Sequence, residues 1–203
     1  MKQEDLLFFK EAIPFWESLT AEQQDTLENE VSFHIFPART IIHGGTIDLS
    51  GLFLVMTGQV RAYIISETGK EITLYHLFDR DICIFSASCV MKDISFDVLV
   101  EAEKETTAFL IPSFVFKDLM QSSLAVSNYT NQLMSSRFSD VMWIMEQILF
   151  MSFDKRLAMF LLEQATIEGS DQLAITHEII AKHMGTAREV VTRMLKYFAS
   201  EGM

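Results

Sequence analysis

Residues 176–198 read THEIIAKHMGTAREVVTRMLKYF, and this stretch carries the most information about fold and function. Its apolar spacing predicts two short helices, His177–Met184 and Ala187–Ala199, with Gly185 at the turn between them. Glycine suits that turn because it adopts a positive φ without the steric cost that other residues incur. Two helices joined in this way are typical of a helix-turn-helix, whose second helix enters the major groove of DNA.

Capping signals mark the start of both predicted helices. Thr176 can cap the first helix, and Thr186 with Glu189 forms a Thr-x-x-Glu capping box for the second. The second helix is amphipathic, because an apolar stripe that includes Val191 and Phe198 is predicted to be buried. Its opposite face carries polar and charged side chains, at Arg188, Glu189, Thr192, Arg193 and Lys196.

The charged face of the second helix predicts contacts to DNA bases. Arg188 and Arg193 each carry a planar guanidinium that can bind the O6 and N7 atoms of guanine. The Glu189 carboxylate can accept a hydrogen bond from the amino group of cytosine, although its capping role gives it a second, purely local interpretation. An ordinary helical hairpin with a solvated charged face is the alternative. The two arginines together with the caps favour DNA binding.

The charge distribution leaves this C-terminal part able to approach a polyanion. The 203-residue chain carries a net charge of −12, yet residues 154–203 hold 6 basic and 7 acidic side chains, a balance of −1. Residues 1–153 hold 10 basic and 21 acidic side chains and therefore most of the acidity. The sequence contains no apolar run of about 18 residues, so no membrane span is predicted. The acidic N-terminus and the presence of only two cysteines predict a cytoplasmic protein.

Val31–Ile111 differs from the rest of the chain, because about eight short runs rich in Ile, Val, Phe, Tyr and Thr alternate there with turn signals. The runs Arg61–Ser66 and Glu71–Phe78 flank a Glu-Thr-Gly-Lys turn and predict a β-hairpin. This spacing, without helical periods, predicts an antiparallel barrel or sandwich. Before this region, Thr20 and Gln23 form a Thr-x-x-Gln capping box at the start of a helix.

A long helix is predicted after the β region, since Ser122–Met151 contains neither proline nor glycine. Asp154 is expected to cap a further helix that Gly169 ends, and residues 170–175 are expected to form a short strand. One face of the long helix has apolar residues spaced 4, 3, 4 and 3 apart, as in a heptad seam. We expect this seam to join two copies of the chain, with a core helix of a monomer as the alternative. The seam residues are Met134, Phe138, Val141, Met145 and Ile148.

With these features, the chain resembles transcription regulators of the Crp/Fnr family, the relatives of the cyclic-AMP receptor protein. GTAREVVTRML (residues 185–195) matches the recognition-helix pattern of that family, and the resemblance covers nearly the whole chain. It implies an α+β fold with an N-terminal antiparallel β-roll (double-stranded β-helix, jelly-roll-like), a long dimerisation helix and a C-terminal winged helix-turn-helix. The implied parts are an effector-sensing β-roll domain with flanking helices (1–120), the dimerisation helix (121–152) and the DNA-binding domain (153–203), whose wing is missing or truncated.

The resemblance also implies functional roles. The protein is expected to be a homodimeric transcriptional regulator that binds a palindromic operator in double-stranded DNA, with RNA polymerase as a further partner. Arg188, Glu189 and Arg193 would read bases, which implies half-sites like TGTGA. Contacts to or near phosphates are implied for Thr176, His177 and Thr186, and the DNA-binding set is completed by Thr192 and Lys196.

A β-roll of this family usually holds an effector, and members that bind cyclic nucleotides carry Gly-Glu followed by an arginine beside Ser or Thr. Residues 79–103 contain no glycine, and no arginine lies between Arg80 and Arg137, so cyclic AMP is not an expected ligand. Cys83 and Cys89 are candidates for effector binding or a thiol redox switch, with buried structural cysteines as the alternative. No sequence motif indicates a haem site. The residues that could bind haem iron are scattered along the chain, and they are the two cysteines, His34, His43, His76 and Met56.

An enzyme is the alternative function class. A small β-barrel with three histidines fits a cupin-like metal-dependent enzyme or a small-ligand-binding β-barrel protein. Metal sites of that kind need clustered ligands, but the sequence has no His-x-His motif. It also has no Gly-x-Ser-x-Gly motif and no phosphate-binding loop. We therefore predict neither an enzyme nor a metal site.

Overall fold

The computed structural model describes residues 2–44, 50–84 and 98–202. Contacts within the chain divide it into two compact units. The second unit combines the C-terminal part of the chain with a short segment of the β region. The first unit comprises residues 1–63 and 75–139, and the second comprises residues 64–74 and 140–203.

Helices flank the strands of the β region at both ends. α1 (Gln3–Ala12), the 3-10 helix η1 (Trp16–Ser18) and α2 (Ala21–Glu30) precede the first strand. α3 (Ser113–Ser122) and α4 (Leu124–Phe150) follow the last strand. Within the described residues, the strands are β1 (Ser32–Phe36), β2 (Thr40–His43), β3 (Gly51–Thr57), β4 (Val60–Ile65), β5 (Glu71–Leu77), β6 (Ile82–Cys83), β7 (Leu99–Ala102) and β8 (Thr106–Pro112).

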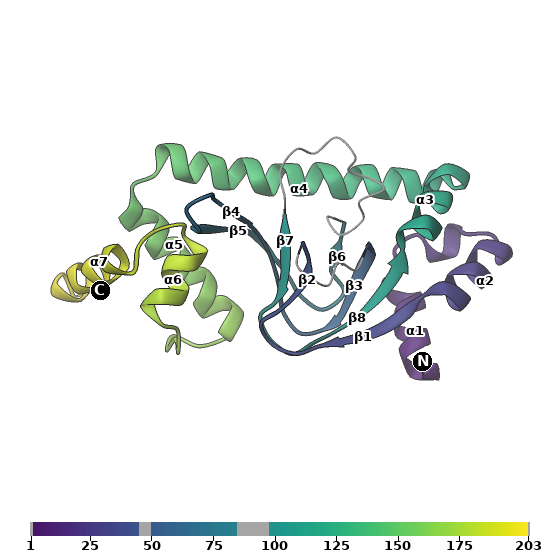
Figure 1. Cartoon of the computed structure of the whole chain (residues 1–203), viewed down its shortest axis with the longest axis horizontal. Coiled ribbons are helices and arrows are strands. Elements are labelled where there is room, and N and C mark those ends of the chain that lie inside the picture. The colour runs from purple at the N-terminus through teal and green to yellow at the C-terminus, as the bar shows by residue number, and fades with distance from the viewer. Residues whose placement is uncertain (1, 45–49, 85–97, 203) are drawn as a thin grey trace. The chain divides into compact units, whose positions relative to one another are not determined.

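The strands form two curved four-stranded sheets, in the orders β1-β8-β3-β6 and β2-β7-β4-β5 (Figure 1). The pairs β1–β8, β3–β8, β2–β7 and β4–β7 are all antiparallel. Both sheets keep edge strands, so the described residues form an open β-roll and no closed barrel. The predicted hairpin is confirmed, because β4 and β5 are neighbours in one sheet. The expected antiparallel β-roll is therefore confirmed.

An aromatic core holds the N-terminal helices against the sheet that contains β8. The Phe109 side chain on β8 is completely buried. Its ring centroid lies 5.3 Å from that of Phe9 on α1 and 5.4 Å from that of Phe33 on β1. Large buried rings contribute most of the apolar area in such a core, and contacts between ring edges and faces add to this stability. Residues 108–111 of β8 are all buried, so side chains on both faces of this strand are covered by packing.

The capping box before α2 is confirmed and leads to a stability prediction. The Thr20 hydroxyl oxygen accepts a hydrogen bond from the Gln23 backbone N–H at 3.3 Å, and the Thr20 N–H donates to Gln23 Oε1 at 3.0 Å. We expect Thr20→Ala to lower the free energy of unfolding by about 1 kcal/mol, because a backbone donor loses its acceptor. Chemical denaturation measures this change. Thr26→Ala is the matched control, since the Thr26 hydroxyl only bonds a carbonyl within the helix; an equal loss in both variants would contradict the capping argument.

Three helices form the C-terminal part: α5 (Phe153–Glu168), α6 (His177–His183) and α7 (Arg188–Ser200). Gly169 ends α5 in the left-handed conformation with φ of 60°, as predicted. The predicted cap at Asp154 is wrong, because the helix begins at Phe153 and its N-cap is Ser152. A hydrogen bond from the Ser152 side chain instead lowers the pKa of the Asp154 carboxyl.

The predicted strand at residues 170–175 is also wrong. This segment has no strand structure. The Ser170 side chain donates to the Gln172 carbonyl at 3.1 Å and accepts from the Gln172 N–H at 3.1 Å. Local bonds of this kind compete with a strand ladder for the backbone groups.

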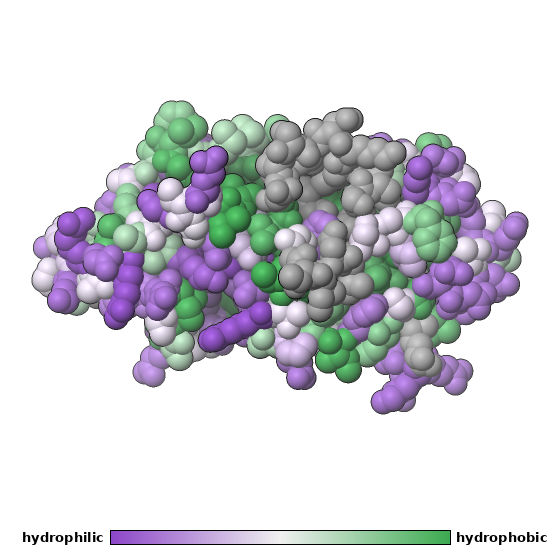
Figure 2. All heavy atoms as spheres, viewed as in Figure 1, coloured by the Kyte–Doolittle hydropathy of each residue, from purple (hydrophilic) through white to green (hydrophobic). Residues whose placement is uncertain are grey.

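α4 is a 27-residue helix whose apolar face is open to solvent in the single chain. Phe138, Met145 and Ile148 are 68%, 46% and 40% exposed. Val141 is half-buried, and Met134 packs partly against the N-terminal core. Figure 2 shows hydrophobic side chains at the surface over the C-terminal end of α4, in the upper left. No described helix is both long enough and apolar enough to cross a membrane.

Candidate nucleic-acid interface

A small apolar core fixes α6 and α7 against each other and against α5. Leu157 on α5, Ile180 and Ala181 on α6, and Val191 on α7 are all at most 5% exposed and pack together. The small Ala181 side chain lets α7 approach α6 closely. Around this cluster lie partly buried side chains, including Met194, Leu195 and Phe198. Of the predicted α7 stripe, Val191 is fully buried, whereas Phe198 is only partly buried, as are Met194 and Leu195.

The turn between α6 and α7 has the geometry that Gly185 predicts. Gly185 adopts a φ of 64°, which is in the left-handed region that favours glycine. The Thr186 N–H then donates to the Ala181 carbonyl at 3.0 Å and closes the end of α6. The predicted cap of α6 is confirmed as well, because the Thr176 hydroxyl oxygen accepts from the Ile179 N–H at 3.2 Å.

The predicted capping box of the second helix is wrong. α7 begins at Arg188 with Ala187 as its N-cap, and no side chain caps it. With Ala187 at the cap, Val190 rather than Glu189 takes the third helical position. The helix thus begins one residue later than a capping box of Thr186 and Glu189 requires. Glu189 has no capping role, and its exposed side chain belongs to the polar face of α7.

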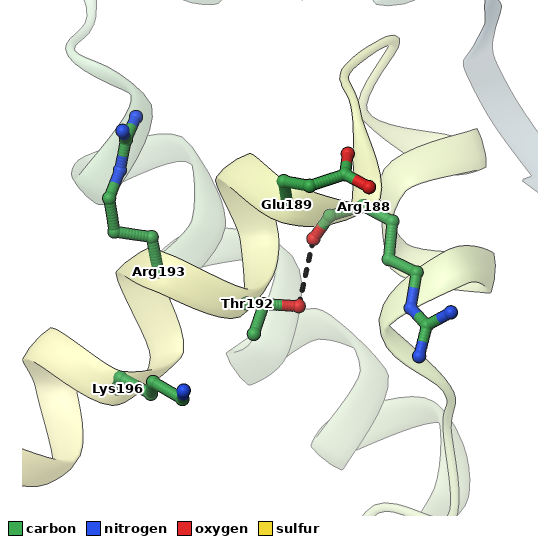
Figure 3. Close-up of a pocket in the computed structure, with 5 residues that line it drawn as sticks. All are labelled: Arg188, Glu189, Thr192, Arg193 and Lys196. Atoms are coloured by element: carbon green, nitrogen blue, oxygen red, sulfur yellow. Dashed lines mark hydrogen bonds between the residues drawn. The ribbon is translucent and has the colours of Figure 1, made fainter.

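The five predicted residues on the polar face of α7 border one open concavity of about 470 Å³. Figure 3 shows that the Arg188 and Arg193 side chains extend away from the helix axis and away from each other. Lys196 lies one turn further along the helix. Arg188, Glu189, Arg193 and Lys196 are exposed, and Thr192 is half-buried. The structure thus brings together the residues that the sequence assigns to base reading.

Both arginines are available for an external partner. Neither Arg188 nor Arg193 forms a salt bridge with any residue that the structure describes. Arg188, Arg193 and Lys196 carry three positive charges, against one negative charge on Glu189. A face with a balance of +2, on a chain of net charge −12, can attract phosphate while most of the molecule repels it.

Thr192 has a role that the sequence does not reveal. Its hydroxyl donates to the Arg188 carbonyl at 2.9 Å (Figure 3). The same hydroxyl lies 2.9 Å from Nδ1 of His177. Because the hydroxyl hydrogen points to the carbonyl, we assign His177 Nδ1–H as the donor to the Thr192 oxygen. His177 therefore connects the start of α6 to the middle of α7. The hydrogen bond between Thr192 and His177 thus fixes the polar face of α7 relative to α6.

Thr176 and Thr186, the other predicted phosphate contacts, lie at opposite ends of α6. Thr176 is exposed, and Thr186 is half-buried at the turn. Since the Thr176 oxygen serves as the helix cap, its hydroxyl hydrogen can still donate to a phosphate. Lys182 on α6 was not included in the predicted set. Its ammonium group lies 3.1 Å from Glu71 Oε1, a contact with no signal in the local sequence.

The candidate sensor residues are only partly described. The Cys83 side chain is buried on β6, where its backbone pairs with Phe53 on β3. Cys89 lies outside the described residues. His34 hydrogen-bonds to Ser32 at 2.8 Å, and burial lowers the pKa of its imidazole.

The β-roll contains a buried arginine whose burial the sequence does not predict. Arg61 on β4 is only 2% exposed, and it lies directly opposite Glu101 on β7. Its guanidinium is 2.9 Å from the Glu101 carboxylate and 4.0 Å above the Tyr63 ring. A buried charge needs such partners, because an isolated one is costly. Since carboxylate and ring already surround it, Arg61 does not replace the arginine of a cyclic-phosphate site.

Known proteins resemble this chain in both sequence and fold. Residues 155–203 match the Crp-like helix-turn-helix domain. An anaerobic regulatory protein of Aggregatibacter actinomycetemcomitans is 27% identical over 201 residues, which cover 94% of this chain and 76% of that protein. The regulator CLP of Xanthomonas campestris shares the fold with a TM-score of 0.72 at 16% identity, covering 90% of this chain and 93% of CLP.

A stronger similarity connects the whole chain to one solved structure. A transcriptional regulator of the Crp/Fnr family from Eubacterium rectale is 51% identical and has a TM-score of 0.91. The matched region covers 95% of this chain and 89% of that protein. The chain therefore belongs to the Crp/Fnr family of transcriptional regulators.

Proposed function

We propose that two copies of this chain bind a palindromic operator, each with α7 in the major groove of one half-site. The proposal rests on the exposed arginines of α7, which have no salt-bridge partner among the described residues. The family comprises transcriptional regulators that bind DNA as dimers, so the cupin-like enzyme and the simple ligand-binding barrel are set aside. Arg188, Glu189 and Arg193 read bases of a TGTGA-like half-site. Backbone phosphates are contacted near Thr176, His177, Thr186 and Lys196.

We assign one function to each of three chain segments. Residues 1–120 sense a signal, residues 121–152 form the dimer contact, and residues 153–203 bind DNA. The exposed apolar side chains of α4 support the second assignment, because a second copy of the same helix would bury them. Met134 contributes least, since it already packs against the N-terminal core.

The β-roll senses the signal, which is a small molecule or a change of redox state. Residues that would hold a cyclic phosphate are lacking, and the Arg61 guanidinium is already paired. Cys83 and Cys89 are the candidates for redox control, and a haem has no support. RNA polymerase is the proposed protein partner, and the cytoplasm, where DNA and polymerase meet, is the proposed location.

Selection of bound sequences from a random DNA pool tests this function. The purified protein should enrich two inverted TGTGA-like half-sites, and the Arg188→Ala/Arg193→Ala variant should enrich none. Parallel selections with and without a reductant test thiol control, which predicts different enrichment in the two arms. Enrichment of sequences without inverted symmetry, or equal enrichment by the double variant, would contradict the proposed reading of DNA.

A further inference from the structure

The hairpin between β4 and β5 reaches the helix-turn-helix. Its tip, residues 64–74, belongs to the same compact unit as residues 140–203. We call this segment the hairpin tip. Figure 1 shows the hairpin that carries it, and the contacts below join it to α6 and to the turn before α7.

Backbone and side-chain contacts attach the hairpin tip to the end of α6. Ile72 forms an antiparallel bridge with Met184. The hydroxyl of Thr73 lies 2.9 Å from Nδ1 of His183, a residue 110 positions later that is only 9% exposed. These contacts are specific, since a bridge fixes the register of two backbones and a buried ring nitrogen needs its partner.

Gly185 is adapted to this contact as well as to the turn. A Cβ atom on Gly185 would lie 2.5 Å from Cγ1 of Ile72 and 3.3 Å from the Glu71 carbonyl oxygen. A side chain at this position would therefore collide with the hairpin tip. The absence of a side chain serves two purposes: it permits the positive φ of the turn, and it makes room for Ile72.

A charged contact accompanies the apolar one. Glu71 Oε1 lies 3.1 Å from Lys182 Nζ, with 10% of the Glu71 side chain and 51% of the Lys182 side chain exposed. Glu71 is nearly buried but Lys182 is half-exposed, so solvent still screens the pair and its contribution to stability is small. It does, however, neutralise a cation on α6 that would otherwise be available to a phosphate. The hairpin tip itself holds Glu67, Lys70 and Glu71, a balance of −1.

The contact borders the surface assigned to DNA. A pocket of about 320 Å³ is lined from the hairpin side by Gly69, Lys70 and Glu71. Thr186 and Arg188, from the proposed phosphate-contacting and base-reading sets, line it from the helix side. An acidic hairpin at the edge of this surface would face the phosphate backbone of a bound duplex. Like charges would then repel each other at short distance.

We propose that the hairpin tip is an autoinhibitory element that competes with operator DNA for the surface beside Thr186 and Arg188. This inference rests on the proposed function of α7. When the tip is docked, Glu71 pairs with Lys182 and blocks the approach of a phosphate. When the tip withdraws, Lys182 becomes a phosphate contact. Because Glu71, Ile72 and Thr73 lie at the start of β5 itself, a change in the position of β4 and β5 can move the tip and shift the balance between the two states.

A reversible disulfide between the hairpin tip and the turn tests the competition. Bridge partners in antiparallel pairs have Cα atoms roughly 4.5–5.5 Å apart, which suits a disulfide. We expect oxidised Ile72→Cys/Met184→Cys to lose at least tenfold in affinity for the selected operator, and reductant to restore it. The Ile72→Cys and Met184→Cys single variants, treated with the same oxidant, control for the native cysteines and should not change.

A charge variant gives a second readout that does not depend on disulfide formation. Glu71→Gln should raise operator affinity roughly two- to fivefold, the range expected when a surface ion pair is lost. Glu67→Gln, which removes the same charge from the same tip, is the matched control and should have a smaller effect. The difference between the two variants isolates the Lys182 contact from general electrostatic attraction.

The outcomes separate this inference from the proposed function. If neither the wild-type protein nor the Glu71→Gln variant binds an operator, the proposed function fails. If it binds but the oxidised double variant binds equally well, the competition is refuted. Tighter binding after oxidation would also refute it, because the hairpin tip would then belong to the DNA-binding surface. Equal affinities of Glu71→Gln and Glu67→Gln would remove the assigned role of the ion pair with Lys182.

Discussion

Replacing both Arg188 and Arg193 with alanine is expected to reduce operator affinity by roughly 30-fold to 10⁴-fold. Each guanidinium that bonds two atoms of a guanine contributes about 1–3 kcal/mol of discrimination, and the two residues lie five positions apart on α7. Both side chains are exposed, so their removal leaves the core of α5, α6 and α7 unchanged. The folded state should therefore be retained, and circular dichroism can verify this.

Selectivity distinguishes base reading from simple charge attraction. Arg193→Ala alone should relax base preference at one position of each half-site, as measured by competition with operators mutated at single positions. Lys196→Ala should weaken binding to every sequence about equally and reduce its salt dependence. Lys155→Ala is the control, because Lys155 is an exposed cation on α5 and lies outside the polar face of α7. It should change neither the affinity for DNA nor its salt dependence. Unchanged selectivity in Arg193→Ala would remove this residue as a base reader.

Met145→Glu is expected to convert the dimer to monomers. Met145 is 46% exposed in the single chain, so glutamate is tolerated there without a partner. In the dimer it would bring an unpaired carboxylate into an apolar seam, which costs several kcal/mol in each copy. Operator affinity should fall by orders of magnitude, because two half-sites can no longer be bound by one linked pair of helices. Sedimentation at micromolar concentration measures the association state.

A matched variant on the same helix controls for the added charge. Ser136 lies on the side of α4 opposite the heptad seam, and its side chain is exposed. Ser136→Glu should therefore remain dimeric. A monomeric wild-type protein, or a dimeric Met145→Glu variant, would contradict the assignment of the seam and would require another surface for self-association.

Local features of the fold could be predicted closely from the sequence. The bounds of α6 and α7, the positive φ at Gly185 and the capping box at Thr20 all follow from signals within a few residues. Errors arose where a shift of one or two residues decides which side chain caps the helix. Moving the cap from Thr186 to Ala187 removed a capping box, and moving it from Asp154 to Ser152 removed another cap.

Contacts between distant residues could not be predicted. Glu71 and Lys182 each read as a solvated surface charge, and nothing near either residue indicates the other. The burial of Arg61 depends similarly on Glu101, which faces it only because β4 and β7 pair in register. Thr192 is polar and reads as a DNA contact, while its hydrogen bonds to Arg188 and His177 depend on the packing of two helices. Register and helix packing decide such partners, and a single sequence does not display them.

Binding to operators of different half-site spacing tests the central claim most directly. Two recognition helices of one dimer should fit half-sites about 10 base pairs apart, centre to centre, which is one turn of B-DNA or roughly 34 Å. Adding half a turn places the second half-site on the opposite side of the duplex, where the second α7 cannot reach it. We predict tight binding of two chains per duplex at the one-turn spacing and a large loss of affinity at the half-turn spacing. Equal affinity at both spacings, or one chain bound per duplex, would contradict a dimer that reads DNA through paired recognition helices.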